Sequence, residues 1–192
     1  MRKMTRILIA AALGTFVLTM MVSAQETEKK VQGTRIGVKK CKMCHSKAKT
    51  GAQYKVWASS AHAKAYETLA TPKAAEFAKA RGIEGSPQKS DKCLKCHITA
   101  FGMTEKEMSK SKITLEEGVS CESCHGGGSL YYKKKTMSGL YKGTIKPEDV
   151  GLVMPNKDLC VTCHNEESPS YKEFDFDTFF AKIAHPIPEA KK

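Results

Sequence analysis

The pattern Cys-x-x-Cys-His occurs four times in this chain, at residues 41–45, 93–97, 121–125 and 160–164. It uses all eight cysteines of the sequence. The pentad is the attachment signature of c-type haem, because two thiols two residues apart reach the two vinyl groups of the porphyrin and the adjoining imidazole binds the iron. The sequence therefore predicts four covalently attached c-type haems, numbered here in chain order. Their attachment and proximal residues are Cys41, Cys44 and His45; Cys93, Cys96 and His97; Cys121, Cys124 and His125; and Cys160, Cys163 and His164.

Two other uses of the cysteines have to be weighed against haem attachment. An exported chain with eight cysteines could be a disulfide framework, and four Cys-x-x-Cys pairs could hold two zinc ions. Neither use needs a histidine after each pair. With 6 histidines in the whole chain, their presence in all four motifs favours haem.

The N-terminus has the pattern of a secretory signal peptide. Three basic residues lie within the first six, an apolar stretch runs over residues 7–22, and the small-residue site Val22-Ser23-Ala24 precedes Gln25. The alternative is a retained membrane anchor, but the polar segment after the site favours cleavage. We expect a signal peptide over 1–24, one tetrahaem domain over 25–192, a periplasmic or secreted location, and no membrane span after cleavage.

The charge and length of the mature chain are those of a haem-packed domain. Removing the signal peptide leaves 29 Lys and Arg against 20 Asp and Glu, a net charge of +9. Eight haem propionates offset much of this excess, so nucleic-acid binding has little support and the basic residues suit redox partners with acidic docking surfaces. With about 42 residues per haem, the porphyrins must supply much of the apolar interior.

Two histidines lie outside the motifs, His62 and His185. Apolar residues at three- and four-residue steps predict a helix over 54–69 that carries His62 on its apolar face. A second aromatic helix, capped by Asp177, is expected to end at His185 before Pro186. Each histidine could be a packed core residue, but haem iron takes a sixth ligand, so we predict that both are distal iron ligands.

Two further segments have recognisable signals. Thr71-Pro72 predicts the start of a connecting helix that runs to Arg81 and stops at Gly82. The three glycines 126–128 let the backbone turn sharply and pass close to a porphyrin.

Several segments resemble the tetrahaem cytochrome c-554 family known from ammonia-oxidising bacteria. They are the first motif 41–45, Trp57, Ala61-His62-Ala63-Lys64-Ala65, Phe101-Gly102, and the stretch Gly118 to Gly126 around the third motif. The resemblance implies a periplasmic, mostly α, compact multihaem domain with haems in stacked pairs and little or no β-sheet. The best-known member accepts electrons from hydroxylamine oxidoreductase.

The resemblance also implies particular iron ligands. It makes His62 the distal ligand opposite His125, and His185 the distal ligand opposite His164. The second haem, on His97, has no sixth protein ligand in the family. The family supplies the distal histidine of the first haem from the loop after the third motif, where this chain has Lys133 to Met137 instead. Met137 is the nearest residue able to bind iron there, with Met103, Met108 and Met154 as weaker candidates.

Three functions follow, in decreasing order of support. The first is a periplasmic electron carrier that transfers electrons between redox proteins. The second is an enzyme in which the open haem on His97 binds and reduces or oxidises nitric oxide, hydroxylamine or nitrite. The third is a subunit of an extracellular cytochrome filament. No acid or donor near the second motif announces a catalytic role, so we expect no catalytic residue.

Overall fold

The computed structural model describes residues 30–188, so the expected signal peptide lies outside the described residues. Ten short α-helices and five 3-10 turns form this part of the chain, which contains no strand. This confirms the prediction of a mostly α fold. The helices are α1 (Val38–His45), α2 (Gln53–Ser59), α3 (Ala65–Thr68), α4 (Pro72–Ala80), α5 (Asp91–His97), α6 (Glu105–Ser111), α7 (Cys121–His125), α8 (Lys134–Tyr141), α9 (Lys157–Val161) and α10 (Phe176–Ala181). The 3-10 turns are η1 (Ala48–Thr50), η2 (Pro87–Lys89), η3 (Leu115–Glu117), η4 (Gly128–Leu130) and η5 (Glu148–Val150).

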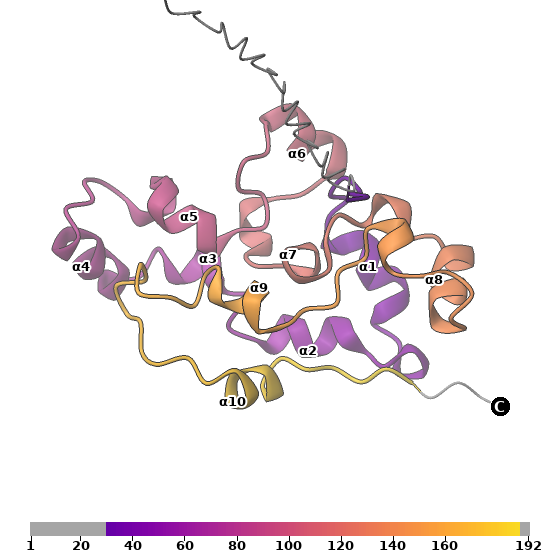
Figure 1. Cartoon of the computed structure of the whole chain (residues 1–192). Coiled ribbons are helices and arrows are strands. Elements are labelled where there is room, and N and C mark those ends of the chain that lie inside the picture. The colour runs from indigo at the N-terminus through magenta and orange to yellow at the C-terminus, as the bar shows by residue number, and fades with distance from the viewer. Residues whose placement is uncertain (1–29, 189–192) are drawn as a thin grey trace, which may run out of the picture.

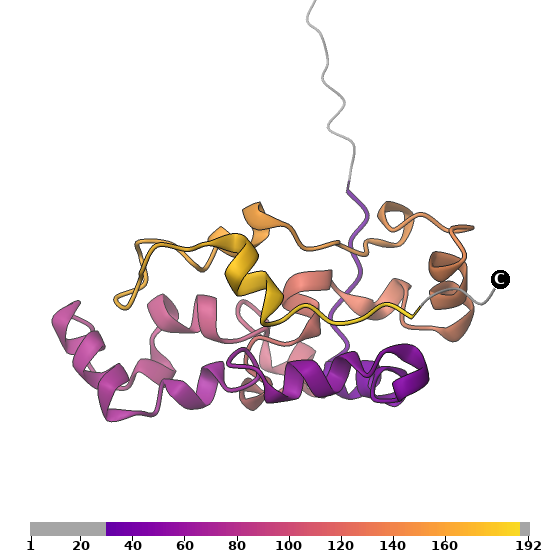
Figure 2. The ribbon, with the colours of Figure 1, turned by 90° about the horizontal axis from the view of Figure 1, so that it is seen from below.

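The chain runs along the molecule and returns (Figure 1). Helices α1 to α5 form one layer from the α1 end to the α4 end, and the C-terminal segments lie over it (Figure 2). After α10 the chain runs back to the end that holds α1 and α8. Within residues 30–188 no helix has the length and hydropathy of a membrane span.

The helix predicted over residues 54–69 is wrong in its length, because the structure divides it into α2 and α3. Ser60 turns the backbone to an extended conformation and its hydroxyl donates to the Trp57 carbonyl at 2.7 Å. Such a local hydrogen bond competes with helix continuation. The His62 carbonyl instead accepts from the Val119 amide at 3.0 Å. His62 therefore lies in the turn between two helices rather than on a helix face.

The start of α4 was predicted correctly. Thr71 is its N-cap and accepts from the Ala74 amide at 3.2 Å, Pro72 is its first residue, and Gly82 follows its end with a φ of +63°. The prediction for α10 was wrong at both ends. Its N-cap is Asp175, which accepts from the Thr178 amide at 2.8 Å, and the helix ends at Ala181, before His185.

The core made by side chains is small. Ile98, Ala100 and Ile113 form a buried cluster, with a few half-buried residues packed against it. Those residues are Tyr66, Leu94, Met103, Met108 and Leu115. So small a side-chain core suits a domain whose interior is completed by haem.

Candidate haem centres

Each of the four pentads begins on a separate short helix. Three of these helices, α1, α5 and α7, end at the motif histidine, and α9 carries the first cysteine of the fourth motif. Helical geometry puts the two cysteines of a motif, three residues apart, on one face. It also leaves the histidine at the end of the helix, where its ring can turn toward an iron.

The motifs approach one another in two pairs. Helices α1 and α7 are in contact, and the Cys41 thiol lies beside Cys121, which together with burial raises the pKa of Cys41. At the other end, burial and the neighbouring Cys163 raise the pKa of Cys96 to about 11. Lys95 and Glu167 form a salt bridge between the second motif and the loop after the fourth. The first and third attachment sites are therefore neighbours, and so are the second and fourth.

Three proximal histidines have a hydrogen bond at Nδ1. Nδ1 of His97 donates to the Ala65 carbonyl at 2.7 Å, and Nδ1 of His125 donates to the Val153 carbonyl at 3.0 Å. That of His45 pairs with the Gln53 side-chain oxygen at 3.0 Å. A metal-binding histidine usually donates its other ring N–H in this way, which fixes the tautomer and leaves Nε2 free for the metal. These three rings are held as iron ligands need to be.

The two histidines outside the motifs each lie opposite a proximal histidine. The ring centroids of His62 and His164 are 6.0 Å apart, and those of His185 and His125 are 5.8 Å apart. Two imidazoles on opposite faces of one iron have centroids roughly 6 Å apart, since each metal–nitrogen bond is about 2 Å. The donor chemistry and the spacing of both pairs therefore fit a haem with two axial histidines.

The pairing itself corrects the expectation taken from the resemblance. That expectation put His62 opposite His125 and His185 opposite His164. In the structure, His62 faces the fourth motif and His185 faces the third. The C-terminal segment accounts for the position of His185, because it runs back past the fourth motif toward the end of the molecule that holds α1 (Figures 1 and 2).

Burial favours the neutral form of the paired histidines. It is the main cause that lowers the pKa of His62, His164, His125 and His185. The neighbouring His164 lowers the pKa of His62 further, and His125 that of His185. Iron binding needs the neutral imidazole, so these surroundings favour the form that binds a metal.

The methionine candidates differ in their surroundings. Met137 is half-buried on α8, at the end of the molecule that also holds α1 (Figure 1). Its assignment to the first haem stays a prediction. Met103 and Met108 pack against the side-chain core, and Met154 is 56 % exposed. The surroundings of these three methionines favour none of them as an iron ligand.

Sequence reasoning missed two buried carboxylates beside the motifs. Glu122, 4 % exposed, accepts from the amides of Ile36, Gly37 and Gly128 at 2.7–3.1 Å. Glu117 accepts from the Val38 amide at 3.1 Å, and its second oxygen is buried without a partner. These carboxylates satisfy amides at and before the start of α1. Glu122 thereby fastens the helix of the first motif to that of the third.

The glycines after the third motif allow other backbone segments to pass close to them. A Cβ on Gly127 would strike the backbone of Gly33, and a Cβ on Gly126 would lie 2.8 Å from the Gly151 carbonyl oxygen. Gly126 also has a φ of +74°. The close approaches seen here are to other backbone segments, and the expected approach to a porphyrin stays a prediction.

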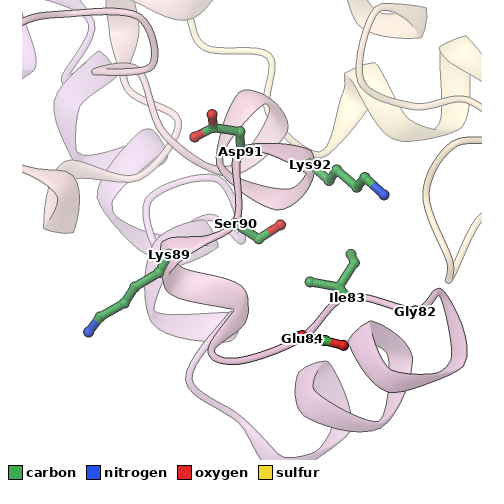
Figure 3. A pocket seen from close by; sticks show the side chains of 7 residues that line it. All are labelled: Gly82, Ile83, Glu84, Lys89, Ser90, Asp91 and Lys92. Carbon is green, nitrogen blue, oxygen red and sulfur yellow. The ribbon is translucent and has the colours of Figure 1, made fainter.

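Two other features take no part in the site. A surface hollow of about 460 Å³ is lined by Gly82 to Glu84 and Lys89 to Lys92, none of which is a histidine or cysteine. Its charged side chains point outward in different directions (Figure 3). In the described part of the chain no three histidine, cysteine or acidic residues gather to hold a metal ion, and all eight cysteines are free of disulfides.

Similarity to known proteins extends over most of the chain. The family model described as cytochrome c554 and c-prime matches residues 40–126, which include the first three motifs. The chain is 31 % identical over 183 residues to cytochrome c-554 of Nitrosomonas europaea, with 87 % of this chain and 72 % of that protein covered. No solved structure matches.

Proposed function

Because the chain belongs to the cytochrome c-554 family, we propose that it is a periplasmic tetrahaem electron carrier. Membership makes it a c-type cytochrome with covalently bound haem. The count of four haems rests on the four pentads. The observation that carries the proposal is the spacing of His62 from His164 and of His185 from His125, which suits two haems with closed, six-coordinate irons.

Bound haem supplies a reversible one-electron couple at each iron. The chain's own part is to hold the ligands still. The Ala65 and Val153 carbonyls fix the rings of His97 and His125 through Nδ1. Fixed rings keep the same ligand set and orientation in both oxidation states, so that little rearrangement accompanies electron transfer. This favours a carrier.

The grouping of the motifs supports transfer within the molecule. Cys41 lies beside Cys121, and Cys96 beside Cys163. We expect the first haem to lie close to the third and the second close to the fourth. The third and fourth motifs adjoin as well, because Cys160 and Cys163 both contribute to raising the pKa of Cys124 to about 11, after burial. A continuous order first–third–fourth–second follows from these contacts.

The α1 end of the molecule is suited to an acidic partner. Nine basic and no acidic residues lie between Lys30 and Tyr66, and five lysines and no acidic residue lie between 133 and 147. These two segments contain α1, η1, α2 and α8, of which α1 and α8 lie together at one end of the molecule (Figure 1). The lysines of α1 and Lys133 to Lys135 are exposed. We expect a redox partner with an acidic face to dock there, near the first haem.

Mass spectrometry of the exported protein tests the proposal at its base. Four covalent haems should be found on a chain that begins near Gln25. Fewer haems, or bound zinc, would refute the tetrahaem assignment.

Docking is tested separately. Replacing Lys133 to Lys135 with glutamine should slow electron exchange with an acidic redox protein and weaken the salt dependence of the rate. The same change at Lys79, Lys89 and Lys92, near the α4 end, is the control.

A second candidate function is redox chemistry on a small ligand at the haem of His97. The observation in its favour is that both histidines outside the motifs lie against other haem sites, His62 at the fourth and His185 at the third. Neither is left for His97. An open iron there could take nitric oxide or a similar ligand, and ligand uptake by the reduced protein is the test.

A further inference from the structure

One side-chain amide contacts the surroundings of two different haem sites. The Gln53 oxygen pairs with Nδ1 of His45 at 3.0 Å, and the Gln53 nitrogen donates to the Pro186 carbonyl at 2.9 Å. His45 is the proximal residue of the first motif. Pro186 directly follows His185, whose ring faces His125 of the third motif. Gln53 thus lies between a ligand of the first iron and the segment that carries a ligand of the third.

The surroundings of the amide fix which way it faces. Its nitrogen is close to two carbonyl oxygens, those of Thr50 and Pro186, which can only accept hydrogen bonds. The oxygen of the amide must then face His45, so Nδ1 of His45 is the donor. This leaves the Nε2 lone pair of His45 for the iron. The tautomer of His45 follows from the hydrogen-bond network and not from its ring position alone.

The local backbone is shaped for this contact. Gly51 has a φ of +98°, and a Cβ there would strike both the Gln53 side chain and the Pro186 carbonyl. The other two proximal histidines with Nδ1 bonds use main-chain carbonyls as acceptors. Of these three, His45 alone depends on a side chain, which one substitution can change.

We propose that Gln53 is a positioning residue that couples the ligand sets of the first and third haems, an inference that rests on the proposed tetrahaem function. It orients His45 and sets how strongly that imidazole donates to iron. It also holds the backbone after His185 so that this ring stays opposite His125. A change at Gln53 therefore reaches both irons, although neither is bound by Gln53.

Two substitutions separate this role from a general packing role. Gln53→Leu removes the acceptor from His45, which weakens the imidazole as a donor and should raise the midpoint potential of the first haem. Gln53→Glu puts a stronger acceptor there and should lower that potential. Both remove the donor to Pro186, so both should convert part of the third haem from low-spin to high-spin. Glutamate preserves size and polarity if leucine disturbs folding.

The measurements are a redox titration and an EPR spectrum of each holoprotein. Each Gln53 variant is also combined with Cys41→Ala and Cys44→Ala, which remove the attachment of the first haem. The redox component that shifts should then be absent, which assigns it to the first haem. Gln88→Leu is the matched control, because the Gln88 amide donates to the Tyr66 carbonyl and not to His45 or Pro186. Tyr141→Phe frees the Pro188 carbonyl without touching His45, and should leave the first potential unchanged.

The outcomes separate the two levels of inference. Potential shifts of the same sign in the Leu and Glu variants, or no new high-spin signal in either, overturn the coupling. His185→Ala is measured in parallel. If it converts a haem to high-spin while the Gln53 variants do not, only the role of Gln53 fails. If it converts none, the ligation assumed in the proposed function fails, and the coupling fails with it.

Discussion

The ring of His62 lies opposite the ring of His164, with 6.0 Å between their centroids. The backbone of His62, however, is held by the segment before the third motif, through the bond from the Val119 amide to its carbonyl. The main chain of His62 is thus bonded to the segment before the third motif, while its ring lies beside the histidine of the fourth motif. This arrangement gives the third and fourth motifs a shared structural element.

The first prediction concerns this pairing. His62→Ala should turn one low-spin haem high-spin, and that haem should be the fourth, because His164 loses its opposite imidazole. The assignment is made in a variant that lacks the fourth haem through Cys160→Ala and Cys163→Ala. In that background His62→Ala should leave the EPR spectrum unchanged, whereas His185→Ala should still create a high-spin signal. The reverse result would restore the pairing with His125.

The second prediction concerns the buried carboxylate between the first and third motifs. Glu122→Ala leaves the amides of Ile36, Gly37 and Gly128 without an acceptor. The loss should be about 3–5 kcal/mol of unfolding free energy, seen as a Tm lower by roughly 10 °C in a thermal melt of the holoprotein. Glu122→Gln, which retains one acceptor oxygen, should lose less. Exposed Glu105 is the control, and an equal Tm for Glu122→Ala and Glu105→Ala would contradict the role of Glu122.

The third prediction concerns the pH dependence of stability. Burial raises the pKa of Glu117, one of whose oxygens has no partner. The folded protein then holds this proton to a higher pH than the unfolded chain does. The contribution of Glu117 to stability is therefore fully present below the unfolded pKa and is lost as the pH rises through the folded pKa.

Glu117→Gln tests this directly, because glutamine does not titrate. The unfolding free energy of the wild type should fall more steeply than that of the variant as the pH rises from about 4 toward neutrality. Chemical unfolding at a series of pH values measures the difference. A difference that grows in the opposite direction, or a constant difference, would show that Glu117 is not protonated preferentially in the fold.

The sequence predicted what depends on neighbouring residues. The pentads have fixed spacings, and the Thr71-Pro72 start and Gly82 stop of α4 are local signals. The mostly α class followed from the resemblance. The break at Ser60 was missed because apolar residues at three- and four-residue steps continue through it. The Val119 amide, which donates to the His62 carbonyl, comes from a segment distant in sequence.

The site was predictable in its residues but not in its connections. Six histidines in this pattern predicted the ligands, while the proximity of His185 to His125 depends on the path of the C-terminal segment. Glu122 looked like one of the variable positions within a motif, although its partners lie at Ile36 and Gly37. Gln53 gave no signal, because its two partners are distant from one another in sequence.

The last prediction concerns small ligands. Four proximal positions and two distal ones account for all six histidines, so two irons lack a second imidazole from their own chain, those of His45 and His97. The haem of His97 should be high-spin and should bind nitric oxide when reduced. The haems of His125 and His164 should not, because His185 and His62 close them. Optical titration with nitric oxide, compared between wild type and His62→Ala, should show one additional binding iron in the variant.

The haem of His45 is then decided by Met137. If Met137 binds its iron, the oxidised protein should show the near-infrared band of a sulfur-ligated ferric haem, and Met137→Ala should abolish the band and create another high-spin iron. Met154→Ala is the control, because that side chain is 56 % exposed. Four low-spin haems in dilute wild-type protein, with no nitric oxide uptake after reduction, would contradict an open site at His97. That outcome would remove the enzyme alternative and leave electron transfer as the function of all four haems.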